Sequence, residues 1–191
     1  PGFSDAMTKV FGEQFGVFFS RPTETTMSIM TIFVIIGISK SLAESYKLDG
    51  ISAAVISLAA FFVLTPFVTN FTPEGAKTAV EVGGVIPTEW AGSKGLFVGI
   101  FTAIFATEIV RYVIKKGWVI RMPEGVPPTV SRAFSSLIPG AVAIVIFDLV
   151  RLVFTWTSFG TIHNFIYKVL QMPLTSLGAT LGATLIANFF I

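Results

Sequence analysis

The 191-residue sequence contains no cysteine, one histidine and few charged residues. The lack of cysteine excludes disulfides, metal–thiolate sites and thiol nucleophiles. The sequence also lacks a nucleophilic-serine elbow, a phosphate-binding loop and an HExxH zinc motif, so nothing in it favours an enzyme. We therefore expect no catalytic residue, no metal site and no cofactor here. The one histidine, His163, has no carboxylate or second ligand near it in sequence, and we expect it at the surface.

The scarcity of charge indicates a membrane protein. Charged residues make up 13% of the chain, against roughly 25% in an average globular domain. Hydrophobic residues make up 53%, and the mean hydropathy is +0.80. The net charge of +2 is too small to suggest a nucleic-acid partner, and the basic residues gather at the ends of apolar segments. A lipid membrane is the expected environment.

Five apolar segments are long enough, or nearly so, to cross a bilayer, which takes about 20 residues as a helix. A shorter segment, 162–171, has apolar and polar faces and predicts a helix lying in the membrane interface. We therefore expect an all-α polytopic membrane protein with about five transmembrane helices and one interfacial amphipathic helix. Pro66 should kink or stop the second span, and the connection 70–94 should hold a short extended hairpin. The five expected spans are 24–43, 50–73, 95–114, 133–156 and 174–191.

Two acid–base pairs within the apolar segments stand three residues apart: Glu108 with Arg111, and Asp148 with Arg151. Charges at bilayer depth are costly, which raises a functional hypothesis for each pair. The first pair lies near a segment end, where anchoring to headgroups is the favoured interpretation. The second lies deeper. A buried pair or polar cavity wall and simple interfacial anchoring both remain open for it.

The last segment carries a repeat, LGATLGAT, that places small residues every four positions. Such a ridge allows two helix backbones to approach closely in lipid. It predicts either a contact with another subunit or moving domain, or ordinary packing within one bundle. The residues assigned to this helix-packing ridge are Gly178, Gly182 and Ala183.

The run RMPEGVPPTVSRAFSSLIPG, residues 121–140, reads as a loop between two spans, with adjacent prolines that would fix defined contacts. The two inter-span connections on its side carry seven Lys and Arg residues, against five on the opposite side. By the positive-inside rule, the loop is expected in the cytoplasm.

This loop, together with PGFSDAMTKVFG, GGVIPTEWAGSKGLFV and SFGTIHNFIYKVLQMPLTSLGATLGA, resembles the enzyme IIC sugar permeases of bacterial phosphotransferase systems, specifically the lactose/cellobiose/diacetylchitobiose family. The resemblance covers essentially the whole chain. It implies that residues 1–191 are the N-terminal scaffold and dimerisation half of a longer permease. The family's substrate-contacting histidine and glutamate motifs would follow Ile191, so no substrate-binding residue is expected here, and His163 does not match the histidine motif.

The resemblance further implies a multi-pass homodimer in the bacterial cell membrane that carries a β-linked disaccharide such as cellobiose, diacetylchitobiose or lactose. The IIB subunit, with IIA, would phosphorylate the sugar in the cytoplasm. The loop would then line a cytoplasmic gate or the IIB-docking surface, with Arg121, Glu124 and Arg132 as its polar contacts. The alternatives are a structural or oligomeric membrane scaffold, or the core of an unrelated secondary transporter.

Overall fold

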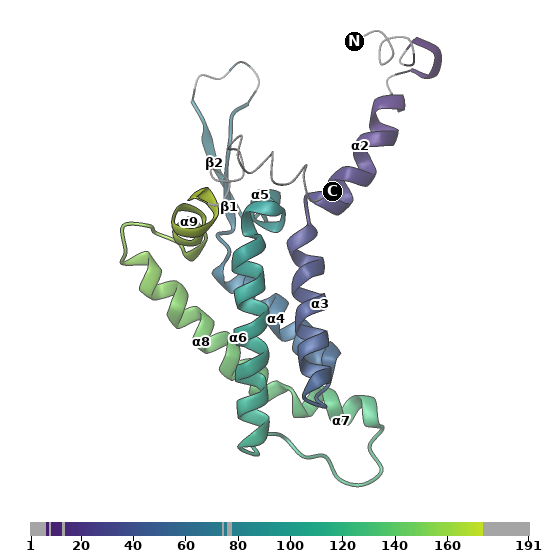
Figure 1. Ribbon diagram of the computed structural model, residues 1–191, viewed down its shortest axis with the longest axis vertical. Coiled ribbons are helices and arrows are strands. Elements are labelled where there is room, and N and C mark those ends of the chain that lie inside the picture. The colour runs from purple at the N-terminus through teal and green to yellow at the C-terminus, as the bar shows by residue number, and fades with distance from the viewer. Residues whose placement is uncertain (1–6, 8, 13, 74, 76–77, 174–191) are drawn as a thin grey trace, which may run out of the picture.

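The computed structural model describes residues 7, 9–12, 14–73, 75 and 78–173, most of them in helices (Figure 1). Four helices form a bundle, with a two-stranded hairpin at one end and a short helix, α7, at the other (Figure 1). A further helix, α2 (Gln14–Met27), precedes the bundle and projects away from it. The bundle helices are α3 (Met30–Ser45), α4 (Gly50–Leu64), α6 (Leu96–Lys115) and α8 (Leu137–Thr155).

Helix α4 has clear start and stop signals. The Asp49 carboxylate accepts a hydrogen bond of 2.8 Å from the backbone N–H of Ser52, which caps the first turn. The helix ends at Leu64 because Pro66 disfavours helical backbone at the residue before it. The expected stop at Pro66 is therefore confirmed, and the helix is shorter than the apolar segment that contains it.

The expected hairpin is also confirmed. Strands β1 (Val68–Phe71) and β2 (Val80–Gly83) pair antiparallel, with Val68 opposite Gly83. In the described part of the chain, the regular structure other than this hairpin is helical. Two short helices, α5 (Thr88–Ala91) and η1 (Ser93–Gly95), lead from the hairpin into α6.

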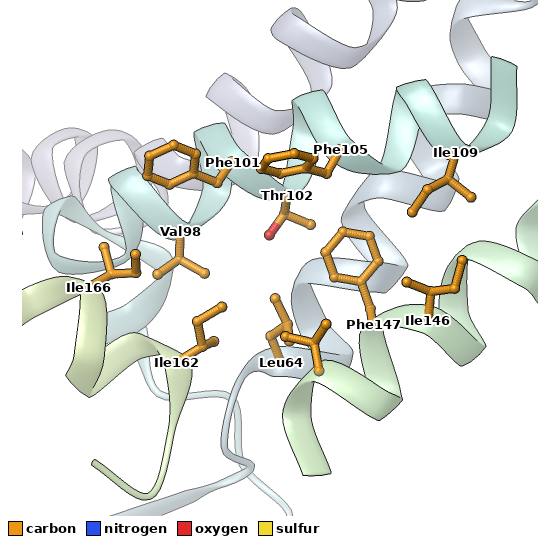
Figure 2. Close-up of a pocket in the computed structure, with 11 residues that line it drawn as sticks. Leu64, Val98, Phe101, Thr102, Phe105, Ile109, Ile146, Phe147, Ile162 and Ile166 are labelled. Carbon is orange, nitrogen blue, oxygen red and sulfur yellow. The ribbon is translucent and has the colours of Figure 1, made fainter. Parts of the chain in front are cut away.

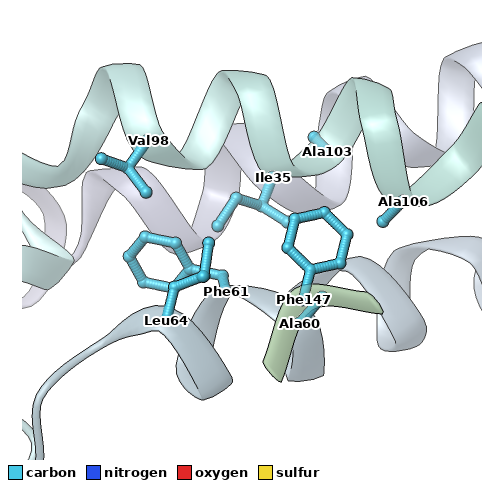
Figure 3. Packing of buried hydrophobic residues seen from close by; sticks show 8 residues of the cluster. All are labelled: Ile35, Ala60, Phe61, Leu64, Val98, Ala103, Ala106 and Phe147. Atoms are coloured by element: carbon cyan, nitrogen blue, oxygen red, sulfur yellow. The ribbon is translucent and has the colours of Figure 1, made fainter. Parts of the chain in front are cut away.

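The core lies where α3, α4, α6 and α8 meet (Figure 3). Its buried members include Ile35, Phe61 and Phe147, which come from three different helices. Helices α3 and α6 approach closely at Gly99, where an added Cβ would lie 2.5 Å from Cγ2 of Thr31. Small residues at such contacts let helix backbones pack tightly, which is how helices associate in lipid.

By length and composition, two helical segments could cross a membrane: Ser93–Lys115 and Pro128–Thr155. The pair Ser20–Met27 and Met30–Ser45, bent by 43°, would make a third if it counts as one span. Helix α4, with 15 residues, is apolar but shorter. The expected class of helical membrane protein is supported, while the expected fifth span, 174–191, lies outside the described residues.

The interpretation of 121–140 as a single loop is wrong. From Pro128 onward this segment is helical: α7 (Pro128–Ser135) is followed directly by α8. Pro128 occupies the first turn of α7, where its fixed φ suits a helix and its missing N–H is not needed. Arg132 therefore stands on a helix, and the irregular connection ends at Pro127.

The expected interfacial helix begins as α9 (Ile162–Ile166) and continues as a π-helical turn, η2 (Tyr167–Gln171). Lys168 and Val169 are both exposed, and no membrane is present against which the apolar face of this segment could be placed. The prediction that this segment lies in the membrane interface stays a prediction.

Candidate functional site

The polar connection between α6 and α8 is held at its base. The Ser135 hydroxyl contacts the backbone carbonyl oxygens of Ile120, at 3.1 Å, and Ser131, at 2.8 Å. This contact ties α7 to the start of the connection. Between these points Arg121 and Glu124 are exposed, and Gly125, at φ +100°, allows the chain to turn. The connection can therefore present charged side chains from a fixed base.

Arg132 faces the start of α4. A cavity of about 210 Å³ is lined by Asp49, Thr129 and Arg132, among others. Hydrogen bonding from Ser52, with a smaller contribution from the positive charge of Arg132, lowers the pKa of the Asp49 carboxyl below its ordinary value. The structure thus brings the predicted Arg132 together with Asp49, which sequence reasoning did not single out.

Glu108 and Arg111 form an ion pair, with Arg111 Nη1 2.9 Å from Glu108 Oε2. Tyr46, from the C-terminal end of α3, donates its hydroxyl to Glu108 Oε1 at 2.6 Å. The Arg111 guanidinium lies 4.0 Å from the centre of the Tyr46 ring, a cation–π contact. The pair is therefore part of a three-residue cluster that joins α3 to α6 near the α7 end of the bundle.

Asp148 and Arg151 also pair, with Arg151 Nε 2.8 Å from Asp148 Oδ1. Their side chains are 47% and 44% exposed in the described part of the chain. They line a cavity of about 340 Å³, together with Thr155 and Thr161. The two side chains place charge on a cavity whose other walls are largely apolar, and both interpretations of this pair, a polar cavity wall and interfacial anchoring, remain predictions.

The expectation that His163 lies at the surface is wrong, because its side chain is completely buried. It packs between aromatic rings, 4.8 Å from Trp90 and 5.4 Å from Phe61 between ring centres. Its Nε2 lies 3.0 Å from the Thr65 hydroxyl oxygen, and that hydroxyl itself lies 2.8 Å from the Phe61 carbonyl oxygen. Since the hydroxyl donates to the carbonyl, Nε2–H donates to Thr65, and His163 joins α4, α5 and α9.

An apolar cavity of about 410 Å³ lies between α4, α6, α8 and α9 (Figure 2). Among its described lining residues, Thr102 is the only polar one, and Phe101, Phe105 and Phe147 contribute aromatic surface. Sugars bind through many hydrogen bonds, and the walls of this cavity provide few groups that can make them. The cavity suits an apolar chain better than a sugar.

The predicted helix-packing ridge (Gly178, Gly182 and Ala183) lies outside the described residues. The site residues that the structure does describe fall at the two ends of the bundle. The α7 end holds the connection with Arg121 and Glu124, α7 with Arg132, and the C-terminal half of α6 with Glu108 and Arg111. Asp148 and Arg151 stand in the C-terminal half of α8, away from α7. Figure 1 shows α7 at one end of the bundle and the hairpin at the other.

Apolar helices long enough to cross a membrane, with ion pairs on two of them and a charged connection between them, define a polytopic helical membrane protein. Comparison with known sequences shows to which family of membrane proteins the chain belongs. The family described as "Phosphotransferase system, EIIC" matches residues 2–191, and the chain belongs to this family of membrane permeases.

Individual relatives are similar over the whole chain. The cellobiose-specific EIIC component of Geobacillus stearothermophilus is 45% identical over 100% of this chain and 42% of that protein. The lichenan permease IIC component of Bacillus subtilis is 42% identical over 98% of this chain and 42% of that protein. The crystal structure of the transporter ChbC, the IIC component of an N,N'-diacetylchitobiose-specific phosphotransferase system, superposes with a TM-score of 0.87. It is 42% identical, over 98% of this chain and 43% of that one. The chain thus spans less than half the length of these relatives.

Proposed function

We propose that this chain is the N-terminal half of an enzyme IIC permease that carries a β-linked disaccharide across the bacterial cell membrane. This proposal rests mainly on the family match over residues 2–191. The named sugars of the relatives, cellobiose, lichenan and diacetylchitobiose, share β-linked glucose-type units, and this supports the substrate class. The imported sugar would be phosphorylated by the IIB subunit, which receives its phosphoryl group from IIA.

Within the permease, residues 1–191 would act as the scaffold and dimerisation half, and the substrate-contacting residues would follow position 191. Two features support this division. The apolar cavity of about 410 Å³ described above offers few hydrogen-bond partners for a sugar. More than half of the length of these relatives also lies outside the part that this chain matches. The protein would work as a homodimer with its α7 end in the cytoplasm, where basic residues concentrate.

The connection 116–127 and helix α7 would line the cytoplasmic gate or dock IIB. Arg121, Glu124 and Arg132 are exposed there, and the bond between Ser135 and Ile120 fixes the base of the connection. Exposed charges on a fixed base suit a transient protein contact, because electrostatic complementarity speeds encounter and fixes orientation.

Replacing Glu124 and Arg132 together by glutamine should reduce sugar uptake roughly tenfold, since each exposed ion pair across a contact contributes up to about 1 kcal/mol. Uptake of labelled cellobiose by cells that express the full-length variant measures the effect, and immunoblots of the membrane fraction measure insertion. The matched control replaces the exposed charges Glu81 and Lys168, towards the other end of the bundle, by glutamine. Unchanged uptake at normal insertion would refute the assignment of this surface.

A further inference from the structure

A groove runs between α3 and α6 near the α7 end of the bundle. It encloses about 610 Å³ and is open along one side. Gly37, Ile38 and Leu42 of α3 and Ile104 of α6 form an apolar stretch of its walls. Ser45, Tyr46 and Glu108 form a polar end, and the Ser41 hydroxyl lies between the two. One groove therefore combines an apolar wall with a polar end.

The polar end presents a positive group that is already oriented. Glu108 is bonded by both Tyr46 and Arg111, so the carboxylate is compensated by its neighbours. The Arg111 guanidinium lies over the Tyr46 ring, 4.0 Å from its centre, and the Arg111 side chain is 42% exposed. A guanidinium carries five N–H donors, and its bond to Glu108 leaves donors for a further anion.

The surroundings are basic. Lys40 and Lys47 on the α3 side, and Lys115 and Lys116 at the end of α6, are all exposed. Lys40 pairs with Glu44 at 3.9 Å and Arg111 pairs with Glu108, so Lys47, Lys115 and Lys116 supply the remaining positive charge, against the single carboxylate of Asp49. The excess of positive charge favours an anionic occupant over a zwitterionic one.

The groove also lies at a depth in the membrane that suits a phospholipid. Helix α6 belongs to a segment long and apolar enough to cross a membrane, and it ends at Lys115. Arg111 stands four residues before that end. At about 1.5 Å per residue this separation is roughly 6 Å, which an arginine side chain can bridge towards the headgroup layer. The apolar walls around Gly37 and Ile38 then lie at the level of the acyl chains.

We propose that this groove binds an anionic phospholipid, with an acyl chain along Gly37, Ile38 and Ile104 and the headgroup phosphate at Arg111. An acyl chain matches the apolar walls, and a phosphate diester matches the free donors of an oriented guanidinium. The lipid would bridge α3 and α6 on the outside of the bundle, at the end where α7 and the charged connection lie.

Gly37 provides a steric test of the site. A Cβ added at Gly37 meets nothing within 4 Å, so a larger side chain there extends into the groove and leaves the core unchanged. Gly37→Leu should therefore fill the acyl-chain position while the protein folds normally. Ala141, an exposed small residue on α8, provides the matched control Ala141→Leu.

Native mass spectrometry of the full-length protein, purified in neutral detergent, tests the proposal. The protein is mixed with phosphatidylglycerol or with phosphatidylethanolamine carrying the same acyl chains. We expect retention of phosphatidylglycerol in preference to phosphatidylethanolamine. Arg111→Gln should weaken phosphatidylglycerol binding about fivefold, the effect of one basic side chain near an anionic lipid. Gly37→Leu should abolish binding of both lipids at this site, while Ala141→Leu and Lys168→Gln should bind as the unchanged protein does.

Equal retention of the two lipids by the unchanged protein, or undiminished binding by Gly37→Leu, would overturn the proposal. A different result would also overturn it. If the protein is a homodimer that retains no lipid, and Gly37→Leu dissociates the dimer, then a second copy of the chain occupies the groove. If inorganic phosphate raises the melting temperature as much as phosphatidylglycerol does, the site binds phosphate without the acyl chain. That result would also overturn the proposal of a phospholipid site.

Discussion

Replacing Gly95 by alanine should strongly destabilise the protein. A Cβ at this position would overlap the backbone carbonyl oxygen of Trp90 and lie 2.8 Å from the carbonyl carbon. These are backbone atoms, so no side-chain rotation relieves the clash, and the turn from α5 through η1 must shift. Overpacking of this kind costs about 1–3 kcal/mol or more in the free energy of unfolding. Thermal melting of the full-length protein in detergent measures the loss.

Gly37→Ala is the control for this experiment. Gly37 lies within α3 and has open space around it, so alanine should leave stability unchanged or raise it by up to about 1 kcal/mol. Gly95 itself has φ −87° and ψ −4°, values that alanine can adopt. The expected difference between the two variants is therefore steric. Equal melting temperatures for both would contradict the close approach of Gly95 to Trp90.

Replacing His163 by alanine should lower the free energy of unfolding by about 3 kcal/mol, as expected for emptying a fully buried aromatic position. The variant loses the hydrogen bond to Thr65 and the ring contacts with Trp90 and Phe61. Lys168→Ala, at an exposed position in η2, is the matched control and should change stability little. Thermal melting at pH 7.5 compares the two.

His163 should also make stability depend on pH. Burial lowers the pKa of its imidazole from 6.5 to about 4, and Nδ1 has no hydrogen-bond partner among the described residues. The unfolded chain therefore binds a proton at a higher pH than the folded one. Stability is fully present above about pH 6.5 and falls by up to about 3 kcal/mol as the pH drops towards 4.

His163→Gln tests this dependence, because glutamine can still donate to Thr65 but does not titrate. The ion pairs on adjoining segments, Glu89 with Lys94 and Asp148 with Arg151, are present in both proteins. The unchanged protein should lose more melting temperature between pH 7.5 and 4.5 than His163→Gln does. Parallel losses would show that His163 is not the titrating group.

The sequence predicted those elements that are determined by residues close together in the chain. The apolar runs gave the membrane class, Pro66 gave the end of α4, and the glycines of the connection 70–94 gave the hairpin. The Asp49 cap was also within reach, because Asp49 and Ser52 precede an apolar run in a capping pattern. The helical start at Pro128 was missed for a related reason: a proline can begin a helix as readily as it fixes a loop.

Contacts between distant segments could not be predicted in this way. Tyr46 lies 62 residues from its partner Glu108, and Thr65 lies 98 residues from His163. A lone histidine carries no local sign that aromatic rings from α4 and α5 will enclose it. The buried position of His163 and the compensated charge of Glu108 both depend on how the helices pack, which periodicity alone does not specify.

Sugar uptake by the full-length protein tests the proposed function most directly. Cells would express the complete reading frame with IIA, IIB and the general phosphotransferase proteins, and receive labelled cellobiose, diacetylchitobiose or lactose. We expect one of these sugars to accumulate in the cell in phosphorylated form, and only when IIB is present. If none accumulates despite correct membrane insertion, or if free sugar accumulates equally without IIB, the proposal of a phosphotransferase permease for β-linked disaccharides is contradicted.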